Sequence, residues 1–206
     1  MDTTSFSTIA LISLLGAMSP GPDFAIVTKN SMTGSFRAGF LTALGVSTAL
    51  LVHVSYCLLG VAILLDESPL LFHTVKYLGS AYLFYLGVML LKENTSVEGS
   101  AKDRPQRRTR QNAFLSGFLC NLLNPKATLF VLSLFTQFIH PTMGFWQKAF
   151  LGSVIAIVGC IWFIFLSFLI THRHLQRHFA RFQVIICKVM GVALCLLSLY
   201  VAFLSS

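Results

Sequence analysis

The chain has 206 residues, of which 55% are hydrophobic and only 11% are charged. A soluble domain usually carries about 25% charged residues, so this composition excludes an ordinary soluble fold and favours a lipid bilayer as the surrounding medium. The net charge of +8 would suggest a nucleic-acid partner for a soluble protein. Here the basic residues concentrate between apolar segments, so we assign them to membrane topology and expect no nucleic-acid partner.

Six apolar stretches are long enough to cross a membrane, because a transmembrane helix needs about 20 mostly apolar residues. Merging the second with the third would leave five, but the acidic, proline-containing break at residues 66–69 is typical of a turn. The sequence therefore predicts an all-α membrane protein, with residues 1–206 forming a single transmembrane domain. The predicted spans cover approximately residues 6–28, 39–65, 69–91, 113–138, 145–171 and 183–204.

The first span contains the sequence SPGPDF, from Ser19 to Phe24. Proline removes a backbone donor and clashes with the preceding helical turn, so Pro20 and Pro22, on either side of Gly21, should break the helix. Asp23 follows directly, and a charge inside a bilayer costs about 2.5–3.5 kcal/mol on insertion scales. We therefore expect Asp23 to face the protein interior and to have a partner there.

The fourth span has a matching break at Asn124, Pro125 and Lys126, the latter a basic residue near the middle of an apolar segment. Asn121 and Asn124 lie at i, i+3 spacing and so share one helix face. These asparagines could cap broken backbone or contact a substrate, and capping is favoured for Asn124. Ser19 in the first break has the same two interpretations.

The two halves of the chain resemble each other. KYLGSAYLFYLGVML from Lys76 is similar to KVMGVALCLLSLYVA from Lys188, and SPGPDFAIV in the first span is similar to NPKATLFVL in the fourth. Since each half holds an odd number of spans, the second half must run in the opposite direction. The pattern predicts two inverted three-helix repeats, at about 6–91 and 113–204, separated by a basic loop at about 92–112.

An inverted arrangement would bring the two breaks together, with the amino ends of two half-helices offering free N–H groups to an anion. We interpret residues 19–23, Asn121 and residues 124–126 as a substrate-binding site for a zwitterion. Lys126 would meet its carboxylate, and Asp23 would meet its ammonium or carry a proton. Alternatively, Asp23 and Lys126 neutralise each other, or Asp23 is hydrated near a membrane surface. A substrate could also replace a salt bridge between the two.

Other residue types with reactive side chains have simpler interpretations. His53 in the second span could relay protons, although a hydrogen bond to a neighbouring helix is the commoner role. The five cysteines all lie in apolar runs and read as core residues, and His172, His174 and His178 lie in a solvated loop, so no metal site is predicted. The chain lacks Ser-His-Asp, GK[ST] loop and HExxH patterns, so we expect neither an enzyme nor a cofactor.

Lys and Arg residues are concentrated after the first, third and fifth spans. The positive-inside rule places these loops in the cytoplasm and both termini outside. Anionic lipid is a further partner to which the basic loop could bind. The sequence leaves the oligomeric state open, homo-oligomers included.

The motifs MSPGPDF, GSAYLFYLG and NLLNPKA resemble those of the LysE/RhtB family of bacterial amino-acid exporters, and the SPGPDF form is most similar to the threonine and homoserine exporters. This resemblance implies export of a small amino acid across the bacterial inner membrane by proton antiport. It also implies a third motif at Gly79, Tyr82, Leu83 and Gly87. The alternatives are an exporter of a metal ion or another small solute, a thiol electron carrier, and a membrane sensor without transport.

Overall fold

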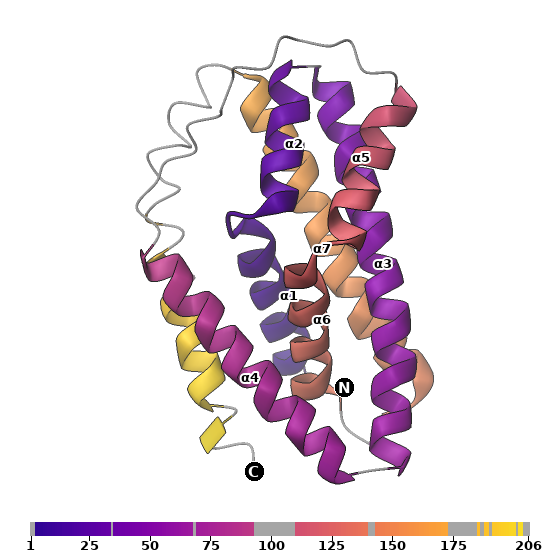
Figure 1. The fold of residues 1–206 in the computed structure, drawn as a ribbon, viewed down its shortest axis with the longest axis vertical. Coiled ribbons are helices and arrows are strands. Elements are labelled where there is room, and N and C mark those ends of the chain that lie inside the picture. The colour runs from indigo at the N-terminus through magenta and orange to yellow at the C-terminus, as the bar shows by residue number, and fades with distance from the viewer. Residues whose placement is uncertain are drawn as a thin grey trace.

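The computed structural model describes residues 3–33, 35–67, 69–92, 110–139, 143–172, 185, 188–189, 191–200 and 202–203. Within these ranges the fold is all-helical, as the sequence predicts. The labelled helices are α1 (Thr3–Met18), α2 (Pro22–Thr33), α3 (Phe36–Glu67), α4 (Pro69–Lys92), α5 (Arg110–Leu122), α6 (Pro125–Phe138) and α7 (Phe145–Thr171), and a further apolar helix covers Gly191–Tyr200 (Figure 1).

Both predicted breaks are present. The axes of α1 and α2 meet at 62°, and those of α5 and α6 meet at 59°, with no more than four residues between the helices of each pair. Pro22 opens α2 and Pro125 opens α6, where the missing proline N–H costs nothing because the first helical N–H groups have no partner within the helix. Each bent pair therefore acts as one broken membrane span.

Three unbroken helices, α3, α4 and α7, are also long and apolar enough to cross a bilayer. Together with the two bent pairs they account for five of the six predicted spans. The helix Gly191–Tyr200 belongs to the sixth, whose first part lies largely outside the described residues. Most of the predicted basic loop, together with His174 and His178, also lies outside them.

Each helix of the first half runs against its counterpart in the second half. Figure 1 shows α1 and α2 running away from the end that holds both termini, whereas α5 and α6 run toward it. The same opposition relates α3 to α7, and α4 to the helix Gly191–Tyr200. This is the inverted arrangement that the sequence predicts, while the boundaries of the two repeats stay a prediction.

The structure also sets the register between the halves. Because α2 begins at Pro22 and α6 begins at Pro125, these two prolines correspond, and Asp23 and Lys126 are each the second residue of a half-helix. This correspondence is shifted by two residues from the sequence match of Ser19-Pro20 with Asn124-Pro125. The two charged residues thus occupy equivalent places in the two repeats.

Glycines allow the closest helix contacts. A Cβ atom at Gly45 of α3 would lie 2.1 Å from the carbonyl oxygen of Phe114, and one at Gly117 of α5 would lie 2.2 Å from the carbonyl oxygen of Thr42. The backbones of α3 and α5 therefore touch directly. Small residues at helix interfaces are the usual way for membrane helices to approach each other this closely.

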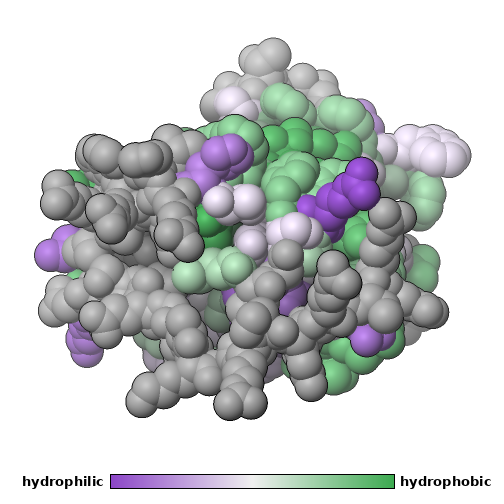
Figure 2. Space-filling model, turned by 90° about the horizontal axis from the view of Figure 1, so that it is seen from above, coloured by the Kyte–Doolittle hydropathy of each residue, from purple (hydrophilic) through white to green (hydrophobic). Residues whose placement is uncertain are grey.

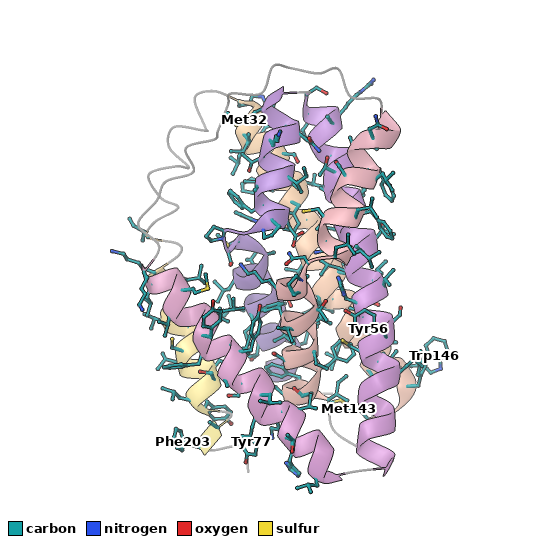
Figure 3. The ribbon with its side chains drawn as sticks, in the orientation of Figure 1. Met32, Tyr56, Tyr77, Met143, Trp146 and Phe203 are labelled. Atoms are coloured by element: carbon teal, nitrogen blue, oxygen red, sulfur yellow. The ribbon has the colours of Figure 1, made fainter. Side chains whose placement is uncertain are left out.

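The outer surface fits a membrane environment. Large apolar side chains are exposed along the helices, and a monomeric soluble protein rarely exposes so many together. Tyr77, Trp146 and Phe203 lie toward the end that holds the termini and point outward, as aromatic residues do at a membrane–water interface (Figure 3). At the opposite end, hydrophilic side chains interrupt the apolar surface of the described residues (Figure 2).

The glycine contact between α3 and α5 gives a first prediction. Gly45→Ala should lower the free energy of unfolding by about 1–3 kcal/mol, because the new methyl group overlaps a backbone atom that cannot move away alone. Gly60→Ala, in the same helix but with no atom within 4 Å of the new Cβ, is the matched control. It should be neutral or stabilising by up to about 1 kcal/mol. Thermal unfolding in detergent measures both, and equal effects would contradict the contact.

Candidate functional site

The two breaks lie against each other in the middle of the molecule and enclose a cavity of about 60 Å³, which we call the central cavity. Every described helix contributes to its lining, the helix Gly191–Tyr200 included. By volume the cavity has room for a few water molecules. Most of the wall is apolar, and the polar groups come mainly from the two breaks.

Asp23 is held by the second break. Its Oδ2 atom accepts a hydrogen bond from Nδ2 of Asn121 at 2.9 Å and another from Nδ2 of Asn124 at 3.0 Å. Asn124 is also the N-cap of α6, since its Oδ1 atom accepts from the backbone N–H of Lys126 at 3.0 Å. The capping interpretation of Asn124 is therefore correct, and the same side chain also binds Asp23.

Lys126 is held by the first break. Its Nζ atom donates to the carbonyl oxygen of Pro20 at 2.8 Å and to the hydroxyl of Ser19. Gly21 makes room for this arrangement, because a Cβ atom there would lie 3.2 Å from Nζ. The lysine thus binds a carbonyl group in the chain break that precedes α2.

These contacts cross between the repeats. Each charged side chain begins at the amino end of one half-helix and bonds to the break of the other repeat. The positive end of a helix dipole favours Asp23 at the start of α2 but disfavours Lys126 at the start of α6. The hydrogen bonds of Lys126 with the first break offset this unfavourable interaction with the helix dipole.

Two acceptor atoms in this network have no hydrogen-bond partner. They are Oδ1 of Asp23 and Oδ1 of Asn121, and both atoms are buried. Their residues both line the central cavity. A buried acceptor without a donor is costly, so this pair of atoms suits a ligand that brings N–H or O–H groups.

His53 of α3 lies beside the second break and is 1% exposed. One ring nitrogen, Nε2, is 3.0 Å from the backbone oxygen of Asn121, while Nδ1 faces the hydroxyls of Tyr56 and Thr128. Hydrogen bonds to neighbouring helices, the commoner role for such a histidine, are thus present. His53 does not line the central cavity, and its role in proton coupling stays a prediction.

A second and wider cavity of about 320 Å³ lies between α4 and the breaks, and we call it the side cavity. Tyr82 and Tyr85 of α4 line it, as does Pro125. Gly21 and Lys126 line both cavities, so the lysine side chain stands where the two approach each other.

A model of the LysE-type translocator family matches residues 14–205, nearly the whole chain. The chain belongs to the LysE-type translocator family. This membership confirms the resemblance read from the three motifs. It makes the protein a membrane transporter rather than an enzyme.

Individual relatives cover most of the chain. It is 31% identical over 183 residues to the uncharacterized membrane protein YrhP of Bacillus subtilis, covering 85% of this chain and 87% of that protein. It is 26% identical over 178 residues to the threonine efflux protein of Escherichia coli K12, covering 85% and 86%. It is 36% identical over 164 residues to the leucine efflux protein of Salmonella choleraesuis, covering 78% and 74%. No solved structure gives a significant match.

In this LysE-type chain the predicted site residues come together around the two breaks, and their role in binding stays a prediction. Asp23 lies in the protein interior, so the alternative of hydration at a membrane surface gains no support. One residue of the third motif lies beside the breaks: Tyr82 lines the side cavity, and its hydroxyl lies 3.4 Å from the backbone oxygen of Lys126. Gly79 approaches Ser133 of α6, and Gly87 approaches Gly191.

Several lining residues were not predicted from the sequence. Ser13 and Phe130 face the central cavity, and a Cβ atom at Gly16 would lie 2.2 Å from the ring of Phe130. The one signal in the sequence is spacing, since Ser13 and Gly16 share a helix face that leads to the first break.

The double role of Asn124 gives a second prediction. Asn124→Asp keeps a good N-cap but replaces the amide that donates to Asp23 with a second carboxylate. The variant should lose about 2 kcal/mol of stability at neutral pH, because a hydrogen bond to a charge is lost and like charges are brought together. Asn112→Asp, an exposed change in the first turn of α5, is the control and should be neutral. Unfolding in detergent tests both, and a stable Asn124→Asp protein would rule out the contact with Asp23.

Proposed function

We propose that this LysE-type translocator exports a small amino acid of the threonine or homoserine kind from the bacterial cytoplasm in exchange for a proton. The substrate would bind in the central cavity between the two breaks. The observation that carries the proposal is the pair of buried, unpartnered acceptors on Asp23 and Asn121 in that cavity.

An ammonium group fits these acceptors. It brings three N–H donors and a positive charge, and Asp23 supplies the opposite charge. Binding would give hydrogen bonds to two buried oxygen atoms that have none in the absence of substrate. A solute without a cationic group would leave both acceptors without the opposite charge that an ammonium brings.

The carboxylate of an amino acid has a complementary place nearby. Lys126 provides a cation on the same cavity wall, and the amino ends of α2 and α6 point their first N–H groups toward the breaks. A zwitterion could therefore bind between a carboxylate and an ammonium group of the protein. In binding, it would compete for groups that now hold the two repeats together.

The relatives support an amino-acid cargo, since two of them are named for the efflux of threonine and of leucine. The alternative is a metal ion or another small solute as cargo. Among the residues that the structure describes, no group of three or more metal-ligating side chains occurs.

The charge of Asp23 supports the proposed exchange for a proton. Either a substrate ammonium or a proton can neutralise this carboxylate, so each would exclude the other. In the proposed cycle the substrate leaves when Asp23 is protonated from outside, and one repeat then moves against the other. In this proposal His53, beside Asn121, would assist proton movement, and its contacts with Tyr56 and Thr128 support that role.

We further propose that the protein lies in the bacterial inner membrane with both termini outside. Both termini lie at the same end of the molecule in Figure 1. The basic residues that follow the first and fifth predicted spans come after α2 and α7, which finish at the other end.

The proposed site predicts the behaviour of Lys126 variants. Lys126→Ala should reduce efflux of labelled threonine from proteoliposomes at least about 100-fold, because it removes a half-buried, hydrogen-bonded charge and the cation for the substrate carboxylate, together about 3 kcal/mol. Lys148→Ala, which removes a half-buried lysine in the first turn of α7, is the matched control and should transport normally. Full efflux by Lys126→Ala would remove the site from consideration.

Proton exchange predicts a response to pH that depends on Asp23. An acidic medium outside loaded proteoliposomes should accelerate efflux by the native protein. In Asp23→Asn this acceleration should disappear, because the amide cannot carry the proton.

His53→Gln keeps a hydrogen-bonding side chain and separates the two interpretations of His53, as a proton relay or as a structural residue. Loss of the acceleration indicates a relay, and its retention indicates a structural role. A native protein that ignores the gradient would argue against proton antiport.

A further inference from the structure

A third buried polar atom without a hydrogen-bond partner belongs to a residue that lines the central cavity, six residues before the first break. Ser13 of α1 is 2% exposed, and its hydroxyl oxygen is buried without a hydrogen-bond partner. The residue lines the central cavity. Its hydroxyl is thus a donor and an acceptor that the protein itself does not use.

This behaviour differs from that of other serines in the same fold. Ser47, Ser133 and Ser167 are also buried within helices, and each donates to the backbone carbonyl four residues earlier, at 2.6–2.9 Å. That local bond is the ordinary way for a buried helical serine to satisfy its hydroxyl. Ser13 forgoes it, although a carbonyl at residue 9 is available in the same helix.

The residues that line the cavity from the same face of α1 as Ser13 are small and apolar. Gly16 and Ala17 continue the same face of α1 along the cavity, and the ring of Phe130 packs directly on Gly16. Ile155 and Leu194 line the cavity from other helices. A lone hydroxyl on such a wall can distinguish ligands, because a ligand without a hydrogen-bonding group leaves it unsatisfied.

We propose that Ser13 recognises a hydroxyl group on the side chain of the transported amino acid, and that it sets the preference for hydroxylated over purely apolar substrates. This inference rests on the proposed function, in which Asp23 and Asn121 bind the substrate ammonium. With the ammonium at the breaks, the substrate side chain would extend along α1 toward Ser13, which lines the same cavity. A site that hydrogen-bonds a substrate hydroxyl rejects the analogue that lacks it more strongly than an apolar pocket can.

Threonine and valine provide the test, because they have nearly the same shape and differ by a hydroxyl in place of a methyl group. Both labelled amino acids are loaded together into proteoliposomes, and their efflux rates are compared for the native protein, Ser13→Ala and Ser47→Ala. The native protein should prefer threonine. Ser13→Ala should lower the threonine-to-valine ratio about tenfold, the value of one hydrogen bond of ordinary strength. Ser47→Ala makes the same chemical change at a hydroxyl already bonded within α3, and should leave the ratio unchanged.

Stability gives an independent measurement without substrate. Removing an unpartnered buried hydroxyl should not destabilise the protein, so Ser13→Ala should unfold at the native temperature or above it, whereas Ser47→Ala should unfold lower. A destabilised Ser13→Ala protein would mean that the hydroxyl serves the fold, and would overturn the inference.

The transport results separate the remaining outcomes. An unchanged ratio in Ser13→Ala, or a native protein that takes valine as readily as threonine, overturns the role of Ser13 and leaves the export of amino acids intact. An equal loss of both substrates would place Ser13 against the shared carboxylate, and would also overturn it. If the native protein exports neither threonine nor valine, the proposed function itself fails. It also fails if Lys126→Ala and Asp23→Asn export these amino acids as fast as the native protein.

Discussion

The crossed hydrogen bonds between the two breaks are the interaction on which the rest of the structure depends. Asp23 binds two amides from the second break, and Lys126 binds a carbonyl and a hydroxyl from the first. In a bilayer core no water replaces such partners, so a broken helix is stable only where protein or a watery cavity satisfies its free groups. Each break thus supplies what the other lacks, and the inverted order of the helices is what brings them together.

Rigid and adjustable contacts are distributed unevenly around this centre. Between α3 and α5 the backbones touch at Gly45 and Gly117, and such a contact leaves no room for relative movement without separation. The contacts across the breaks are made instead by long polar side chains, which can exchange one partner for another. Lys126 in particular lines both cavities. The geometry therefore places the parts that can rearrange next to the proposed ligand, and the fixed parts around them.

Much of this could be predicted from the sequence, because the strongest signals are physical ones. Proline in an apolar segment predicts a break, an isolated charge predicts an interior partner, and similarity between the halves predicts their opposed directions. The register was harder, since matching Ser19-Pro20 to Asn124-Pro125 misses the correspondence of Pro22 with Pro125 by two residues. The crossing of contacts was not predictable either, because it depends on which side chains can span the breaks. The unpartnered hydroxyl of Ser13 could not be predicted, because a serine in an apolar helix usually donates a hydrogen bond to its own helix backbone.

The crossed contacts also bear on how the chain is made. Asp23 and the amide of Asn121 are 98 residues apart, so the aspartate enters the membrane long before its partner has been synthesised. At about 5–20 residues per second, the delay is roughly 5–20 s. During that interval the first repeat must shelter an acidic group in some other way, through a bound proton, a water-filled insertion channel or an escort protein. Because the two repeats bind each other's breaks, the first repeat cannot complete its hydrogen bonds until the second repeat has been synthesised.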